Sequence, residues 1–253
     1  MFNLKILLRN AAKILNYEIK KLPPNRNINV YLDQQALLGN QKVDIIFDVG
    51  ANIGSTTREY LRLFPHSSIY CFEPFKEPFL ILLESFKNFN SVKPFKLAVT
   101  DLVGKKPFFV NKANVTNSLL PPACEYEKYQ SPDMMSTLNT ISVETTTIDY
   151  FCNKQFIDNI QILKMDIQGG ELMALQGAKN MLESASIDVI YTEVLFAKIY
   201  EGQATFYTIG EFLEQYGYIL YGLYHLSYAN NGVVLFGDAI FISPSIEMKL
   251  NTK

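Results

Sequence analysis

The sequence lacks tryptophan and has only two histidines and three cysteines among its 253 residues. The cysteines, Cys71, Cys124 and Cys152, are odd in number and lack the spacing of zinc ligands, so we expect free thiols in a reducing compartment. So few histidines and cysteines argue against a metal site built from these residue types. We predict no metal.

Excess positive charge and long apolar runs are also missing. The net charge is −2, with 23 Lys and Arg against 25 Asp and Glu, whereas nucleic-acid binding by general electrostatics needs a basic surplus. No apolar run approaches the ~18 residues of a transmembrane helix. Basic residues interrupt the N-terminal segment, which therefore does not read as a signal peptide. We expect a soluble, cytoplasmic protein with no nucleic-acid partner and no transmembrane segment.

Residues 1–40 are predicted to form an N-terminal helical extension. Lys5, Arg9 and Lys13 are spaced by four and share one stripe of a helix, while the leucines and isoleucines fall largely elsewhere. A basic amphipathic helix can lie on a membrane surface. Packing against the protein's own domain is the commoner arrangement, and it is the one predicted here.

Strand-like apolar runs then alternate with helix-like segments, which predicts an α/β fold with a mostly parallel sheet and helices on both faces. Strands are expected over residues 44–48, 68–73, 92–98, 160–166 and 187–193. Helices are expected over about 53–63, 75–88, 169–182 and 205–215. Two late runs, 218–224 and 233–242, lack an intervening helix and should pair as an antiparallel hairpin, giving seven strands.

Residues 99–145 depart from this alternation. "GKKPFFVN" predicts a short β excursion, whereas residues 112–140 are polar, contain prolines and show no clear period. A long segment without regular structure is often a lid or a binding loop. We expect such a role for 112–140; disorder without function is the alternative.

Acidic residues stand where the predicted strands end. Asp48, Glu73, Asp166 and Glu193 each close a strand, and His225 follows the sixth. Ligands of open α/β sheets bind outside the carboxyl ends of the strands. One site is therefore expected to collect these side chains, although each acid alone is also compatible with a helix cap.

The turn after the first strand resembles a dinucleotide turn without its central glycine. In "FDVGANIGSTT", Asn52 stands between Gly50 and Gly54, and Asp48 precedes the turn. An acid there would repel a pyrophosphate and suit a cation. Glu73 follows at about the spacing of a ribose-binding acid, roughly 20 residues on. These features favour a ligand with a ribose, no phosphates and a positive end, as in S-adenosylmethionine.

Several motifs together carry a family resemblance. "FDVGANIGSTT", "IYCFEP", "FKLAVTDLVGK", "ILKMDIQGGELMALQGA", "VIYTEV" and "GDAIFIS", over about residues 43–243, resemble the FkbM-type methyltransferase family in order and spacing. The resemblance implies a class I, Rossmann-like methyltransferase fold and methylation of hydroxyl groups, commonly on sugars or polyketide-type products. The family's "DVEG" stretch reads Asp166, Ile167, Gln168, Gly169 here, so no acid stands at 168.

From these patterns we predict the residues that bind S-adenosylmethionine. The turn should approach the methionine part, Glu73 should accept both ribose hydroxyls, and the end of the third strand should edge the adenine. The cofactor-binding candidates are Asp48, Gly50, Asn52, Gly54, Glu73, Ala98, Asp101 and Asp166.

Methyl transfer to an alcohol needs a base that takes the hydroxyl proton. Asp166 is the first candidate, Glu193 the second and His225 the third. Asp166 and Glu193 could also hold Mg²⁺, but no dedicated ligand set accompanies them. The acceptor is expected against the loop 112–140 and the aromatic residues Phe196, Tyr200, Phe206 and Tyr207.

The sequence thus predicts a methyltransferase domain over 41–245, followed by a tail at 246–253. Its expected activity is S-adenosylmethionine-dependent O-methylation of a sugar, glycan or glycosylated natural product. The alternatives are an N- or C-methyltransferase acting on a small molecule, a nicotinamide-dependent oxidoreductase, and a non-catalytic interaction module. The identity of the acceptor and the oligomeric state do not follow from the sequence.

Overall fold

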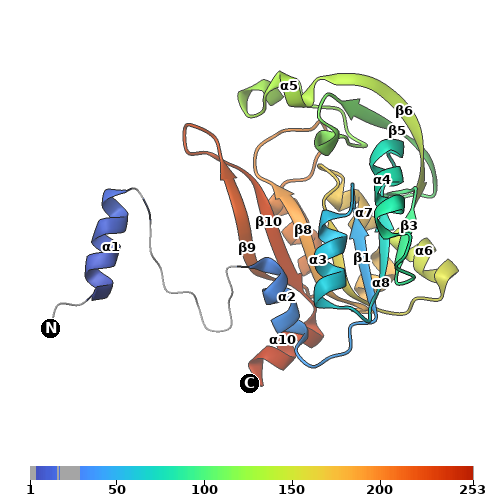
Figure 1. Ribbon diagram of the computed structural model, residues 1–253, viewed down its shortest axis with the longest axis horizontal. Coiled ribbons are helices and arrows are strands. Elements are labelled where there is room, and N and C mark those ends of the chain that lie inside the picture. The colour runs from blue at the N-terminus through green and yellow to red at the C-terminus, as the bar shows by residue number, and fades with distance from the viewer. Residues whose placement is uncertain (1–3, 16, 18–28, 253) are drawn as a thin grey trace.

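The computed structural model describes residues 4–15, 17 and 29–252, which contain a seven-stranded sheet with helices on both faces (Figure 1). The strand order is β3-β2-β1-β7-β8-β10-β9. The strands are β1 (Ile45–Val49), β2 (Ser68–Phe72), β3 (Val92–Phe95), β7 (Ile160–Met165), β8 (Ile187–Leu195), β9 (Ile219–Tyr228) and β10 (Val234–Ile242). The first five in the order run parallel, and β10 is antiparallel to both neighbours. The predicted fold, including the C-terminal hairpin, is confirmed.

Alternation along each central strand supplies two hydrophobic cores. Ile46 of β1 joins a buried cluster with one set of helices, while its neighbour Phe47 joins a cluster with the other set. The first set comprises α2 (Val30–Leu38), α3 (Ser55–Leu63), α4 (Lys76–Phe86) and α10 (Pro244–Asn251). The second comprises α6 (Ile148–Gln155), α7 (Glu171–Gln176), α8 (Lys179–Glu183) and α9 (Phe206–Glu214). Successive side chains point to opposite faces, so both faces of the sheet are buried.

The order of the strands fixes where a ligand can bind. The chain moves outward from β1 through β2 to β3, and then returns to place β7 on the other side of β1. The order therefore reverses between β1 and β7. In open α/β sheets the crevice outside the carboxyl ends of the strands at such a reversal is the usual ligand site.

A second, three-stranded sheet was only partly predicted. Its order is β4-β6-β5, from β4 (Ala98–Val99), β5 (Gly104–Asn111) and β6 (Thr137–Thr146). The expected strand 92–98 is wrong at its end, because Ala98 pairs with Thr145 of β6 and leaves the main sheet. The expected irregular segment is also too long, since residues 137–140 belong to β6. The run "TLNTISVETT" is rich in β-branched residues, which favour strands.

The predicted helix over 169–182 is divided at Gly177 into α7 and α8. A Cβ atom on Gly177 would lie 2.2 Å from the Thr100 carbonyl oxygen and 3.1 Å from Cβ of Thr147. The helix approaches the β4 segment so closely that only glycine fits. This close approach, which a helical periodicity does not reveal, requires glycine at the point where α7 ends.

The N-terminal helix α1 (Leu4–Ile14) carries exposed apolar side chains. Leu7, Ile14 and Leu15 are 58%, 85% and 69% exposed. The prediction that these side chains pack against the domain is therefore wrong. In the part of the chain that the structure describes, no helix has the length and apolarity needed to cross a bilayer.

We predict that Gly177→Ala lowers the free energy of unfolding by about 1–3 kcal/mol, because the new methyl group overpacks the contact with Thr100. The measurement is urea unfolding followed by circular dichroism. The matched control is Gly210→Ala in α9, where a Cβ atom meets nothing within 4 Å. The control should be neutral or stabilising by up to about 1 kcal/mol. Equal effects of both substitutions would contradict this account of Gly177.

Candidate active site

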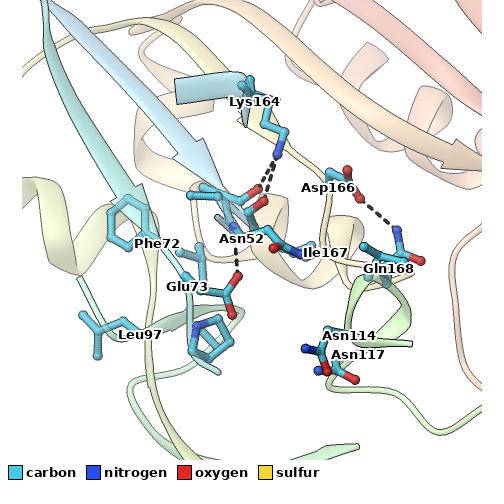
Figure 2. Close-up of a pocket in the computed structure, with 18 of the residues that line it drawn as sticks. Asn52, Phe72, Glu73, Leu97, Asn114, Asn117, Lys164, Asp166, Ile167 and Gln168 are labelled. Atoms are coloured by element: carbon cyan, nitrogen blue, oxygen red, sulfur yellow. Dashed lines mark hydrogen bonds between the residues drawn. The ribbon is translucent and has the colours of Figure 1, made fainter. Parts of the chain in front are cut away.

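A cavity of ≈ 310 Å³ lies at the carboxyl ends of β1, β2 and β7, beside the reversal of strand order. Figure 2 shows residues of these strand ends facing side chains of the segment 114–119 across this cavity. The lining comprises residues 49–53, 55–56, 72–74, 97–99 and 164–168 except 165, together with Phe108, Asn114, Val115, Asn117 and Leu119. The volume falls within the range of small-molecule sites, about 300–1,000 Å³.

The turn after β1 is fixed by its backbone. Gly50 has φ +75°, and a Cβ atom there would lie 1.9 Å from the Asp166 carbonyl oxygen. The backbone amides of Gly50 and Ala51 both donate to the Phe72 carbonyl at 3.0 Å. Asn52 also adopts a positive φ, +50°, which asparagine tolerates better than most residues. Gly50 and Asn52 line the cavity.

Gly54, the other predicted glycine, lies outside this lining. It caps the N-terminus of α3 with φ +90°. A Cβ atom at this position would lie 2.4 Å from the Phe86 ring and 2.8 Å from Leu82. Glycine at this position permits the tight connection between β1 and α3. A contact between Gly54 and the cofactor remains a prediction.

Glu73 follows β2 and faces into the same cavity. Its Oε2 accepts from the Asn52 amide at 3.0 Å, and its Oε1 accepts from the Phe75 amide at 2.8 Å. Burial raises the pKa of Glu73 to about 7, although these two amide bonds act to lower it. The carboxylate is therefore oriented by the chain, and its ionisation falls within the physiological range.

Asp48 turns away from the cavity toward Lys164. The two residues are register partners on β1 and β7, and Asp48 Oδ1 lies 3.1 Å from Lys164 Nζ. Thr57 donates to Asp48 Oδ2 at 2.6 Å, and Lys164 also donates to the Gly50 carbonyl at 3.0 Å. Asp48 is absent from the lining. A direct contact between Asp48 and the cofactor stays a prediction, whereas its observed contact is with Lys164.

Lys164 is the main residue that the sequence reasoning missed. Burial alone would lower its pKa, but the charges of Asp48 and Asp166 outweigh burial and raise the pKa above its usual value. The signal was present in the sequence, because a lysine inside the apolar strand "IQILKM" requires a buried partner. Asp48 at the corresponding position of β1 is that partner.

A second cavity of ≈ 200 Å³ adjoins the first and shares Val115, Asp166 and Gln168 with it. Its other lining residues are Thr116, Gln130, Met134, Met135, Glu193, Leu195, Ile199, Tyr200 and Phe236. The structure thus brings the predicted residues Asp166 and Glu193 to one place. Asp166 lines both cavities, and Glu193 lines only the second.

Gln168 joins these two carboxylates through its amide. Nε2 donates to Asp166 Oδ1 at 2.8 Å and to Glu193 Oε2 at 2.9 Å, and Tyr200 donates to the amide oxygen at 2.8 Å. Figure 2 shows the bond between Gln168 and Asp166 at the cavity. Gln168 holds a positive φ of +56°. The residue that departs from the family's acidic pattern therefore orients both acids without adding a third charge.

The Glu193 carboxyl is the more strongly perturbed of the predicted acids. Burial, followed by the charges of Asp166 and Glu171, raises the pKa of Glu193 well above its ordinary value. Glu171, at the first turn of α7, is itself buried, with a pKa raised by burial to about 7. It accepts from the Ile167 amide at 2.9 Å. Two carboxyls, Asp166 and Glu193, therefore line the second cavity, and the buried Glu171 lies behind them at the start of α7.

The segment between β5 and β6 forms part of both cavities. Ser118 donates to the Gln168 carbonyl at 2.7 Å, and the Tyr200 hydroxyl, whose one proton is shared with the Gln168 amide oxygen, lies 3.0 Å from the Thr116 carbonyl oxygen. Asn117 is buried in the first cavity's lining, and its Nδ2 has no hydrogen-bond partner among the residues that the structure describes. A buried donor without a partner leaves a place for a polar ligand atom.

Some of the remaining predicted site residues line a cavity and others do not. Ala98 lines the first cavity, but Asp101 pairs with Lys106 at 2.6 Å outside it. His225, on β9, contacts Asp238 at 2.7 Å with a side chain 58% exposed, and lines neither cavity. Of the four aromatic residues expected to hold the acceptor, Tyr200 lines the second cavity, whereas Phe196, Phe206 and Tyr207 do not. Within the described ranges, no three His, Cys, Asp or Glu side chains gather as metal ligands.

The comparisons with known proteins agree with this geometry. The model of the methyltransferase FkbM domain matches residues 48–220. The 2-O-methyltransferase NoeI of Sinorhizobium fredii (strain NBRC 101917 / NGR234) is 29% identical over 188 residues, covering 71% of this chain and 74% of that protein.

Two solved structures show weaker similarity. Precorrin-6y C5,15-methyltransferase from Geobacter metallireducens GS-15 has a TM-score of 0.43 at 14% identity, over 89% of this chain and 91% of that one. A putative RNA methyltransferase, PH1948, from Pyrococcus horikoshii has a TM-score of 0.40 at 15% identity, over 96% and 98% of the two chains.

The strand order, the cavity at its reversal and the family match define an S-adenosylmethionine-dependent methyltransferase. The chain belongs to the FkbM methyltransferase family. This assignment sets aside the oxidoreductase and the non-catalytic module that the sequence had left open.

We predict that Lys164→Met lowers the free energy of unfolding by about 3–5 kcal/mol, because it leaves the Asp48 carboxylate buried without its cation. The double variant Asp48→Asn/Lys164→Met should recover most of this loss, since no charge is then left unpaired. Urea unfolding of the two variants and the wild type measures the difference. A double variant as unstable as the single one would contradict the ion-pair explanation.

Proposed function

We propose that this enzyme transfers a methyl group to a hydroxyl of a sugar, glycan or glycosylated natural product. The observation that carries the proposal is the pair of adjoining cavities with Asp166 at their common wall. One cavity accommodates the cofactor and the other the acceptor. The similarity to a 2-O-methyltransferase supports transfer to oxygen.

In the first cavity, Glu73 is placed to accept the ribose hydroxyls of S-adenosylmethionine, and the turn at Gly50 and Asn52 to approach the methionine part. Ala98 borders the adenine end. The unpartnered Nδ2 of Asn117 fits a polar atom of the same ligand. When bound, the cofactor supplies an electrophilic methyl group on a sulfonium centre.

In the second cavity, Asp166 is the proposed general base. It lies where both ligands can be reached, and the amide of Gln168 fixes one of its oxygens at 2.8 Å. An alcohol attacks well only when a positioned base takes its proton. Burial and the neighbouring acids raise the pKa of Glu193, which favours the protonated form relative to an ordinary glutamate, so Glu193 is proposed to donate a hydrogen bond to the acceptor.

The ionisation of Glu73 should control cofactor affinity. We predict that the Kd for S-adenosylhomocysteine rises as the pH falls below about 7, by at most roughly tenfold per pH unit. Protonation of Glu73 removes the charged oxygen that accepts hydrogen bonds from the ribose. Glu73→Gln should bind at least about tenfold more weakly at pH 8, and its Kd should lack this pH dependence. Calorimetric titration of both proteins from pH 6 to 8 measures the effect, with NAD⁺ as the control ligand.

The same group has an opposite effect on the free protein. Because its folded pKa of about 7 exceeds the ordinary 4.5, the folded state retains a proton that the unfolded state releases. Stability from Glu73 is therefore lost as the pH rises from about 4.5 through 7. The free energy of unfolding of the wild type, relative to that of Glu73→Gln, should therefore fall as the pH rises over this range. A difference independent of pH would contradict the buried carboxyl.

The assignment of the base predicts unequal effects of two substitutions. Asp166→Asn should lower kcat about 10²–10⁴-fold, while Glu193→Gln, which preserves a donor, should lower it less. The measurement is transfer of labelled methyl groups to a panel of mono- and oligosaccharides. Binding of S-adenosylhomocysteine, measured separately, shows whether the cofactor cavity is intact. A larger loss of kcat in Glu193→Gln than in Asp166→Asn would indicate that Glu193 is the general base.

A further inference from the structure

Helix α1 presents an apolar face that nothing in the described chain covers. Leu7, Leu8 and Ile14 of the helix, with Leu15 directly after it, recur at helical spacing and therefore share one side. All four are more than half exposed, from 51% at Leu8 to 85% at Ile14. Figure 1 shows α1 apart from the layers of the domain. A soluble domain gains nothing by holding such a face in water.

The charges on the opposite side of this helix are of one sign. Arg9 and Lys13 are exposed and spaced by four, and Lys5 continues their stripe in the sequence. No acidic residue precedes Glu18. The helix therefore has one apolar side and one positively charged side, with no acidic side chain of its own to neutralise the charge.

This charge distribution identifies the occupant of the face. A second copy of α1 carries the same positive charge and offers no acidic side chain before Glu18 that could pair with it. An anionic lipid surface provides both an apolar layer for the leucines and negative headgroups for the basic side chains. The helix spans 11 residues, fewer than the ~20 that cross a bilayer. We propose that α1 docks the enzyme on the surface of an anionic lipid bilayer.

The test is co-sedimentation of the full-length protein with vesicles. Vesicles of phosphatidylcholine with one quarter phosphatidylglycerol should bind the protein at least about tenfold more tightly than vesicles of phosphatidylcholine alone. Binding should weaken when the salt concentration is raised, because screening shortens the range of the attraction.

Two variants separate the contributions of charge and apolar surface. Arg9→Gln/Lys13→Gln should lose the preference for anionic vesicles, a loss of roughly tenfold or more. Leu8→Gln/Ile14→Gln should weaken binding to both kinds of vesicle. The matched control is Lys154→Gln/Lys179→Gln, which removes the same charge from α6 and α8. The control should bind like the wild type, and thermal unfolding should show that all variants remain folded.

The proposal is overturned if the wild-type protein stays in the supernatant with anionic vesicles. It is also overturned if the control variant loses binding as fully as the α1 variants. A third contrary result is a stable dimer that only the Leu8→Gln/Ile14→Gln variant dissociates, with no effect of vesicles. The last would assign the apolar face to a second copy of the chain. Because the readout is sedimentation, the test does not depend on the proposed methyl acceptor.

Discussion

The buried ion pair between Asp48 and Lys164 joins the two strands between which the sheet reverses. Lys164 also donates to the Gly50 carbonyl, so the same ammonium group connects β7 to the turn beside the first cavity. Removing a charge from water is costly unless a partner and further hydrogen bonds compensate for it. Here Thr57 and the turn supply those bonds. The position of the turn relative to β7 thus depends on a pair that is stable only when both members are present.

Alternating hydrophobic runs were sufficient to predict the main sheet, because each central strand must bury both faces. The acids at strand ends were sufficient to place Glu73, Asp166 and Glu193 along two adjoining cavities at one edge of the sheet, since parallel strands end at the same edge. The second sheet was harder to predict. Its strand β6 is largely polar, and the departure of Ala98 from the main sheet depends on pairing with a residue far along the chain, Thr145.

The directions of individual side chains were also not predictable from the sequence. Asp48 has the right position for a cofactor contact, yet its carboxylate is directed toward Lys164, and only the register of β1 against β7 reveals this. His225 ends up beside Asp238 because β9 continues through position 225 to Tyr228. Gln168 appeared to be the loss of an acid, whereas its amide bridges two others.

The segment between β5 and β6 gives the two cavities a common wall, because Val115 lines both and its neighbours Thr116 and Ser118 are fastened to Tyr200 and Gln168. A movement that adapts this wall to one ligand changes the space available to the other. Affinities linked in this way are reciprocal: whatever factor the acceptor contributes to cofactor binding, the cofactor returns to acceptor binding. With the cofactor in one cavity and the acceptor in the other, as proposed, the two binding constants would form a coupled pair.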